Sequence, residues 1–190
     1  VDGNVTGGEG GTKVTVTNKT ELMNALKGTD KKIIYVDGEI EFSGLTNVKS
    51  VQNKTIIGMK GAAFVNSKHS ASVSETGIMQ LSSCKNIILR NIIFKSAGAY
   101  DIDGNDNLTI IGSTYIWVDH CDFQDGVDGN FDCVNGSDNI CVTWCRFRYL
   151  IAPWAGGSGG SNDHRNCDLW GNSDKRSGDE GHLRTTFANC

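Results

Sequence analysis

The sequence lacks the features by which several classes of protein are recognised. Proline appears once in 190 residues, and no segment approaches the ~20 consecutive apolar residues of a membrane-spanning helix. Basic residues number 18 against 22 acidic ones, so the formal net charge is -4 at pH 7. Nucleic-acid-binding proteins usually present a basic face, and this balance disfavours such a role. We therefore expect neither a membrane nor a nucleic acid as a partner.

Cysteine is present, but not at the spacing of a zinc site. The seven cysteines include no C-x-x-C pair. Three of them, Cys121, Cys145 and Cys190, fall at positions that we expect to face the interior, where a thiol behaves as a small apolar side chain. One or two disulfides are an alternative use of the set, and they would imply an oxidising compartment.

Glycine, in contrast, is abundant at 24 residues, which favours many tight turns between strands. One nine-residue pattern occurs three times, at residues 86–94, 115–123 and 139–147. Its apolar residues alternate at the strand period of two, and the alternation slips by one residue within each copy, as a corner between two short strands requires. The slips fall at Arg90–Asn91, Asp119–His120 and Thr143–Trp144. Superposed, the copies align four apolar sets: Ile87, Ile116 and Ile140; Leu89, Val118 and Val142; Ile92, Cys121 and Cys145; and Phe94, Phe123 and Phe147.

The spacing of the copies predicts the architecture. Successive copies start 29 and 24 residues apart, which indicates a solenoid of β-coils whose interior is lined by ladders of like side chains. A fainter copy spans residues 182–190 and would add ladder residues such as Leu183 and Ala188. Because no linker divides the chain, we expect residues 1–190 to form a single all-β domain that is incomplete at its C-terminal end.

The N-terminal residues predict how the first coil is closed. The segment T-G-G-E-G-G at residues 6–11 has the composition of a flexible lead-in. A short helix is expected at Glu21–Lys27, because Asn18 and Glu21 have the spacing of a capping box and Gly28 follows as a stop signal. Such a helix would cover the otherwise open core of the first coil. Strands are expected at Val14–Val16, Lys32–Val36 and Thr55–Ile57.

Three aspartates stand in comparable places before successive strands of the repeat. Asp106 lies ten residues before Ile116, while Asp128 and Asp132 lie twelve and eight residues before Ile140. Adjacent coils stack about 4.8 Å apart, so these carboxylates can converge. They would repel one another unless a cation lay among them, and oxygen ligands without nearby His or Cys suit calcium before magnesium. The alternative is that they are solvated turn aspartates, since Asp-Gly is ordinary turn chemistry.

Four segments together resemble the pectate lyase family. They are TGGEGG followed by VTVTNKTEL, DNLTIIGSTYIWVDHC, DGNFDCVNGSDNI, and GGSNDHR followed by LWGNSD. The W-V-D-H run and the D-x-x-x-D run are specific at these spacings, and the likeness extends over essentially the whole chain. It implies a right-handed single-stranded parallel β-helix with a short N-terminal capping helix. The resemblance covers only the N-terminal part of such an enzyme.

The resemblance also implies a chemistry. Pectate lyases are calcium-dependent and cleave α-1,4-linked polygalacturonate by abstraction of the C5 proton and β-elimination. The family's calcium ligands fall on Asp106, Asp128 and Asp132. Its proton acceptor is an arginine that would lie beyond Cys190, so no catalytic residue is assigned within this chain. The family implies an exported protein, which is secreted, periplasmic or held at the cell surface.

Contacts to the acidic polysaccharide are less closely fixed by the resemblance. A substrate-binding lysine of the family aligns near Ala152, where this chain has no lysine. Arg165 and Lys175 are candidates for holding a uronate carboxylate, and Trp154 for stacking on a sugar ring. Each could equally be a solvated loop charge or a packed loop tryptophan. The conspicuous pair Asp119–His120 corresponds to a structural corner of the coil.

Three other functions compete with a lyase. The first is a non-catalytic galacturonan-binding fragment, or a degenerate homologue, that keeps the metal site without the arginine. The second is a pectin lyase, which needs no calcium and is disfavoured by the D-x-x-x-D run. The third is a purely structural or adhesive solenoid, which would have no reason to gather carboxylates on one side. We expect a monomer, with association through an uncovered last coil as the alternative.

Overall fold

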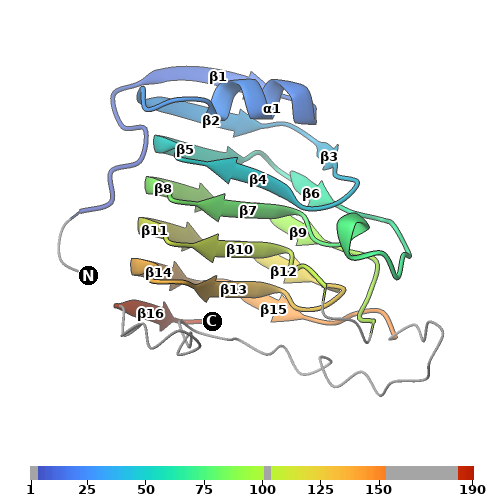
Figure 1. Ribbon diagram of the computed structural model, residues 1–190. Helices are drawn as coiled ribbons and strands as arrows, with labels where there is room; N and C mark the ends of the chain where they lie inside the picture. The colour runs from blue at the N-terminus through green and yellow to red at the C-terminus, as the bar shows by residue number, and fades with distance from the viewer. Residues whose placement is uncertain (1–3, 101–103, 153–183) are drawn as a thin grey trace.

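The structure, a computed structural model, describes residues 4–100, 104–152 and 184–190. Its chain winds into stacked coils whose paired strands run parallel, which makes the fold a parallel β-helix (Figure 1). The strands form three sheets, and one turn of the coil passes through each sheet in succession. No helix among these residues is long and apolar enough to cross a lipid bilayer.

Within the described residues, the sheets contain seven, four and five strands. The seven-stranded sheet contains β1 (Thr12–Val16), β2 (Lys32–Val36), β5 (Gln52–Gly58), β8 (Lys85–Arg90), β11 (Thr114–Asp119), β14 (Asp138–Thr143) and β16 (Thr185–Ala188). The four-stranded sheet contains β4 (Thr46–Lys49), β7 (Met79–Ser82), β10 (Leu108–Ile111) and β13 (Phe131–Val134). The five-stranded sheet contains β3 (Glu39–Glu41), β6 (Ala63–Val65), β9 (Ile93–Lys95), β12 (Asp122–Gln124) and β15 (Arg146–Arg148). The helices are α1 (Lys19–Leu26) and the short 3-10 helix η1 (Val73–Glu75).

The interior ladders follow the register that the repeats predict. Ile116 on β11 lies opposite Ile87 on β8 and Ile140 on β14. Phe123 is fully buried, and its ring lies 4.8 Å from that of Phe94 and 5.0 Å from that of Phe147, in nearly parallel stacks. Stacking in register places each phenylalanine ring of this ladder against a ring of the same kind, which favours close packing.

The corner predicted within each repeat is also present. Asn91, His120 and Trp144 occupy the slip positions, and all three have left-handed backbone conformations, with φ of 57°, 51° and 53°. A left-handed residue turns the chain between two strands without an extra loop. Asparagine tolerates this conformation better than most residues, whereas a bulky side chain there is uncommon.

The last repeat copy is shifted by two residues from the register that we expected. Thr185 lies opposite Ile140 and Phe187 lies opposite Val142, so these two residues continue the ladder. Ala188 lies opposite Thr143 and is not a ladder residue, while Leu183 is outside the described residues. The shift places an aromatic ring over the core, because the Phe187 ring lies 5.9 Å from that of Phe131. Packing of that partly buried ring against the core, where a methyl group would otherwise lie, accounts for the register.

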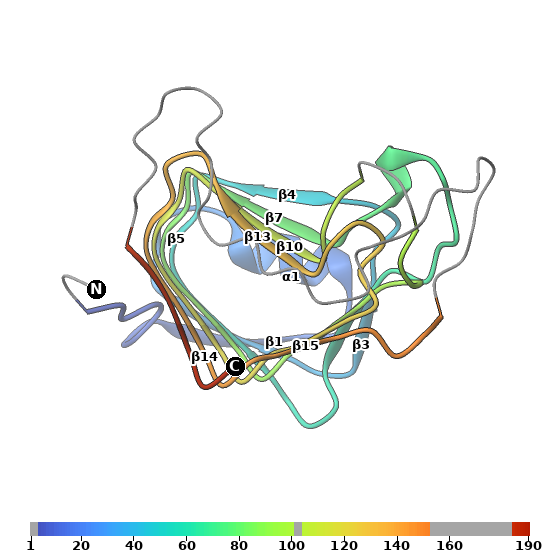
Figure 2. The same ribbon diagram turned by 90° about the horizontal axis from the view of Figure 1, so that it is seen from below.

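Helix α1 closes the N-terminal end of the coil as predicted. Viewed along the stack, it lies across the interior of the coils (Figure 2), and Leu22 and Leu26 are buried in the core. Asn18 is the N-cap, since its Oδ1 accepts a hydrogen bond from the Glu21 backbone N–H at 3.0 Å. The helix therefore starts at Lys19, two residues earlier than expected. The reciprocal bond of the cap goes from the Thr17 N–H to the Glu21 carboxylate, at 2.8 Å.

The expected flexible lead-in at residues 6–11 is instead fixed against the outer face of the seven-stranded sheet. The Gly7 N–H donates to Asn86 Oδ1 and the Gly8 N–H donates to Thr55 Oγ1, each at 2.9 Å. A Cβ on Gly8 would lie 1.9 Å from the backbone oxygen of Lys32. The glycines are therefore needed for close approach between two backbones, not for flexibility.

The cysteines behave largely as small buried side chains. Cys121 and Cys145 lie in the core, as predicted, and Cys190 is exposed in the last described coil. Cys167 lies outside the described residues. The thiols of the described cysteines are all free, so none of the disulfides considered above forms among Cys84, Cys121, Cys133, Cys141, Cys145 and Cys190.

Candidate functional site

The outer face of the four-stranded sheet presents a column of polar side chains. Residues that face the interior from this sheet are apolar and buried, whereas the alternate residues face outward. The parallel register brings four outward residues into one column across the sheet. In spatial order they are Asn47, Gln80, Thr109 and Asp132. This face can therefore make hydrogen bonds to an extended polar ligand.

Asp106 stands at one end of this sheet, two residues before β10. The backbone next to it is paired with the following coil, because the Asn107 N–H donates to the Gly129 oxygen at 3.2 Å. A Cβ on Gly129 would lie 2.4 Å from Asp106 Oδ1. The carboxylate thus lies over the backbone of the next coil, where any larger residue than glycine would displace it. Only 8% of Asp106 is exposed.

Asp128 and Asp132 flank this position on the neighbouring coil. Asp128 lies in the connection between β12 and β13, where its Oδ2 accepts a hydrogen bond from the Gly104 N–H at 3.0 Å. Asp132 lies on β13, in the outward column, and both side chains are half-buried. The structure therefore brings together the three aspartates that the repeat register singled out. We call Asp106, Asp128 and Asp132 the acidic edge.

The electrostatics of the acidic edge disfavour three negative charges. Burial is the largest effect that raises the pKa of Asp106, and the negative charges of Asp132 and Asp128 raise that pKa further. A hydrogen bond with the Asp132 side chain acts in the same direction. The pKa of Asp106 consequently lies well above its ordinary value of 3.8. A bound cation would reverse this effect, because it stabilises the ionised form of each carboxylate.

The donor chemistry of the acidic edge fits a hard cation, although its carboxylates do not enclose a common point. Carboxylate oxygens are the ligands that calcium prefers, and its coordination is flexible in geometry. Within residues 4–100, 104–152 and 184–190, no three His, Cys, Asp or Glu side chains form a ready-made metal cage. A bound cation would draw these carboxylates together, because it offsets the repulsion between like charges.

A buried amide network that sequence reasoning missed supports the connection carrying Asp128. Asn130 Oδ1 accepts hydrogen bonds from the Gly126 N–H at 3.1 Å and from Asn107 Nδ2 at 2.9 Å. Asp125, which is fully buried, accepts from the Leu150 and Ile151 N–H groups at 2.6 Å and 2.9 Å. These bonds tie three successive coils together beside the acidic edge. The signal that could have revealed them is the equivalent place of Asn107 and Asn130 in the repeat.

The corner pair Asp119–His120 is engaged in structural contacts, in agreement with its assignment from sequence. The buried Asp119 carboxylate accepts from Thr143 Oγ1 at 2.7 Å, His120 Nδ1 at 2.8 Å and Arg90 Nε at 3.0 Å. Donors from the neighbouring strands β8 and β14 and from the adjacent corner residue His120 occupy it, so it holds the corners of adjacent coils together.

The proposed polysaccharide contacts fall on a part of the chain for which the structure gives no description. Trp154, Arg165 and Lys175 all lie within residues 153–183. Their roles therefore stay predictions from the sequence.

Comparison with known proteins places these features in context. A family model described as pectate lyase matches residues 1–152. The chain is 32% identical over 177 residues to a pectate trisaccharide-lyase of Thermotoga maritima, covering 89% of this chain and 41% of that protein. It is 32% identical over 197 residues to a probable pectate lyase B of Aspergillus terreus, covering 99% of this chain and 51% of that protein. The chain thus spans about half the length of the curated relatives it matches.

Solved structures agree with the fold. A mutant pectate lyase of Bacillus subtilis superposes with a TM-score of 0.64 at 20% identity, covering 96% of this chain and 62% of that one. A pectate lyase bound to a hexasaccharide gives the same TM-score and coverage. At this level of identity the likeness concerns the fold alone, which is a right-handed parallel β-helix.

Proposed function

The chain belongs to the pectate lyase family, and we propose that it carries the calcium-binding and substrate-binding part of an enzyme that cleaves polygalacturonate by β-elimination. The observation that carries the proposal is the burial of Asp106 against Asp128 and Asp132. Without a cation, placing these three carboxylates side by side only lowers the stability of the fold, because their repulsion raises the pKa of Asp106.

Asp106, Asp128 and Asp132 would hold the calcium ion. Calcium bound there would supply a positive charge that binds the uronate carboxylate and stabilises the negative charge that develops as the C5 proton leaves. The chain's own side chains would orient the polymer. Gln80 and Thr109 lie in the outward column with Asp132, and they can donate hydrogen bonds to sugar hydroxyls. The metal would also explain how an acidic protein binds a polyanion.

The proton acceptor is not among the roles that we assign to this chain. By resemblance it is an arginine beyond Cys190, so the acidic edge supplies binding and charge stabilisation, not the base. Arg165 and Lys175 are proposed to bind uronate carboxylates, and Trp154 to stack on a sugar ring. The substrate is an extracellular polymer, which is consistent with secretion or with a place in the periplasm or at the cell surface.

Calcium titration by calorimetry, together with a lyase assay, tests this proposal. We expect one calcium ion per chain, and polygalacturonate binding that a chelator weakens. Asp128→Asn and Asp132→Asn should each lose calcium binding, whereas the exposed Asp37→Asn should not, which controls for the loss of one negative charge.

The appearance of unsaturated uronates, followed by their ultraviolet absorbance, then separates a lyase from a binding fragment. Chelator-sensitive activity supports the lyase. Calcium-dependent binding without turnover indicates the galacturonan-binding alternative, and activity that persists in chelator contradicts the assignment of the acidic edge.

A further inference from the structure

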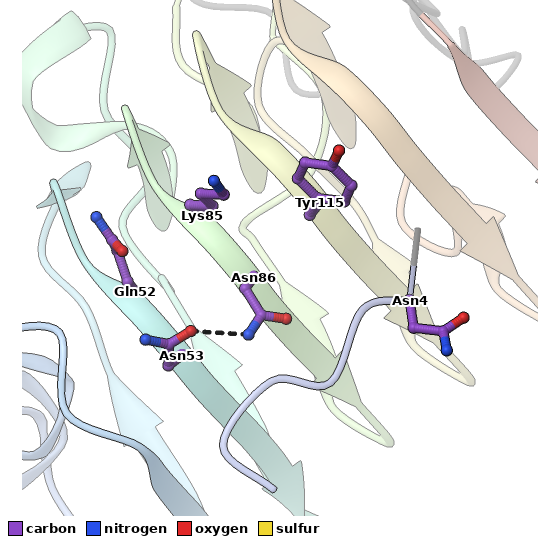
Figure 3. A pocket seen from close by; sticks show the side chains of 6 residues that line it. All are labelled: Asn4, Gln52, Asn53, Lys85, Asn86 and Tyr115. Atoms are coloured by element: carbon purple, nitrogen blue, oxygen red, sulfur yellow. Dashed lines mark hydrogen bonds between the residues drawn. The ribbon is translucent and has the colours of Figure 1, made fainter. Parts of the chain in front are cut away.

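An open pocket of about 400 Å³ lies on the outer surface at the start of strands β5, β8 and β11. Figure 3 shows its lining, which comes from these strand ends and from the N-terminal segment. The lining residues are Asn4, Gln52, Asn53, Lys85, Asn86 and Tyr115. Strand β10 separates the pocket from the acidic edge, because Asp106 precedes that strand and the pocket residue Tyr115 follows it.

Tyr115 is unusual among the residues that begin these strands. The equivalent positions in neighbouring coils are Asn53, Asn86 and Asn139, and all four residues have left-handed backbone conformations with φ of 55° to 59°. Asparagine suits this conformation, whereas a bulky aromatic residue there carries a backbone cost. Nothing in the stacking of the coils requires a tyrosine, since the other three coils use asparagine. The ring is therefore placed in the pocket at a cost to stability.

Two of the three pocket asparagines, Asn53 and Asn86, already make hydrogen bonds within the fold. Asn86 Nδ2 donates to Asn53 Oδ1 at 2.8 Å (Figure 3), and Asn86 Oδ1 accepts from the Thr6 and Gly7 N–H groups, each at 2.9 Å. Asn53 Nδ2 donates to the Thr29 oxygen at 2.8 Å. These bonds fix the rear of the pocket and hold the N-terminal segment at its side. Beside the exposed Asn4, the groups left for a ligand are those of Lys85, Gln52 and Tyr115.

These three groups have complementary chemistry. Lys85 is exposed, and its ammonium lies 5.7 Å from the centre of the Tyr115 ring. Lys85 and Gln52 lie opposite one another in the β5–β8 register. Within the described part of the chain, no carboxylate forms an ion pair with Lys85. A cation, a primary amide and a ring together match an acidic sugar, whose carboxylate, hydroxyls and C–H face each find a partner.

We propose that this pocket is an accessory site for a uronate residue of an acidic polysaccharide. Lys85 binds the carboxylate, Gln52 binds ring hydroxyls, and the Tyr115 ring packs against the sugar face. The sugar class rests on the proposed function, but the site itself needs no metal. It would hold the polymer to the outside of the seven-stranded sheet while a second stretch of the same polymer lies at the acidic edge, which raises the effective concentration of substrate there.

The test is a titration with trigalacturonate in excess chelator, followed by NMR chemical shifts of the chain. Chelator removes the contribution of a metal at the acidic edge, and the positions of the shifted resonances distinguish the pocket from other sugar contacts, so this experiment does not depend on whether the chain is a lyase. We expect shifts at the strand starts that line the pocket. Lys85→Gln should weaken binding about five- to tenfold, whereas Lys13→Gln, which removes an exposed lysine from β1 of the same sheet, should leave it unchanged.

Tyr115→Asn is the decisive variant because it restores the asparagine found in the neighbouring coils. It should weaken binding about tenfold while unfolding at an equal or higher temperature than the parent, so the loss cannot be attributed to misfolding. Methyl-esterified trigalacturonate, which lacks the charge, should bind as weakly to the parent as trigalacturonate binds to Lys85→Gln. Absence of binding in chelator, or binding that Lys85→Gln and Tyr115→Asn leave unchanged, overturns the proposal.

Discussion

The interior ladders and the acidic edge belong to the same coils, yet stacking has opposite consequences for them. Inside, Ile116 lies between Ile87 and Ile140, and each apolar side chain gains from a neighbour of its own kind. At the acidic edge, Asp106 faces Asp128 and Asp132, and the negative charges of these two residues destabilise its ionised form. A coil that repeats every few ångströms therefore stabilises apolar residues without help, whereas repeated charges need an external partner.

Removal of a ladder residue should have the largest effect on stability. Phe123 is fully buried between Phe94 and Phe147, so Phe123→Ala should lower the free energy of unfolding by about 3–5 kcal/mol. Chemical denaturation measures this loss. Phe123→Leu, which keeps most of the volume, should cost less than half as much. A similar cost for both variants would mean that the stack of rings, not the filled volume, stabilises the interior.

Removal of a charge from the acidic edge should raise the free energy of unfolding, the opposite of the effect of Phe123→Ala. In chelator, Asp106→Asn should raise the free energy of unfolding by about 1–2 kcal/mol, because a buried carboxylate next to two others is replaced by a neutral side chain of similar size. Added calcium should stabilise the parent but not the variant. Thermal unfolding with and without calcium measures both effects, and a destabilised variant in chelator would contradict the comparison.

A substitution in the backbone beside the acidic edge, Gly129→Ala, should have a smaller effect. Gly129→Ala would place a methyl group 2.4 Å from Asp106 Oδ1, so the carboxylate must move. We expect calcium affinity to fall about tenfold, which is about 1.4 kcal/mol. Gly38→Ala, where nothing lies within 4 Å of the added methyl group, should leave that affinity unchanged, although the φ of +82° at Gly38 makes the variant less stable. Equal affinities for the parent and Gly129→Ala would place the ion elsewhere.

The smallest effect on stability should come from the ion pair between Asp138 and Arg184, which holds strand β16. This effect depends on pH. Hydrogen bonds from Arg184 lower the pKa of Asp138 from 3.8 to about 2. A carboxyl whose pKa is lowered on folding stabilises the fold above its ordinary pKa and loses that contribution as the pH falls through its folded value. Because Arg184 is half-exposed, the pair contributes at most about 1 kcal/mol.

The matched variant for this pair is Asp138→Asn. It should be less stable than the parent at pH 5, and the difference should vanish as the pH falls from about 4 to about 2. Denaturant unfolding at several pH values measures it. A difference that stays constant over this range would show that the ion pair does not hold strand β16 in place.

The interior could be predicted from sequence because a ladder leaves the same residue types at the same spacing. The register of Phe94, Phe123 and Phe147 follows directly from three superposed copies. The prediction was wrong for the last copy, where similarity is weak and the packing of Phe187 against the core accounts for the register. It was also wrong at Gly7 and Gly8, because glycines that permit close packing have the same composition as glycines that permit flexibility.

The acidic edge could be proposed from the sequence only when the register of the repeats was taken into account. Asp-Gly pairs are ordinary in turns, and the three aspartates became a candidate site only because their distances from equivalent strands place them on adjacent coils. The pocket at Tyr115 was not accessible in this way. The left-handed backbone becomes evident only when φ is known for Tyr115 and its three asparagine counterparts. From sequence alone, a tyrosine in a strand is an ordinary residue.

A crystal structure of the calcium-saturated chain tests the central claim most directly. We expect one cation bound by oxygens of Asp106, Asp128 and Asp132 at ~2.3–2.6 Å, with the coils otherwise stacked as they are here. A calcium-saturated crystal with no ion between these side chains, or with their oxygens turned away from one another, would contradict the claim that stacking gathers them for a metal.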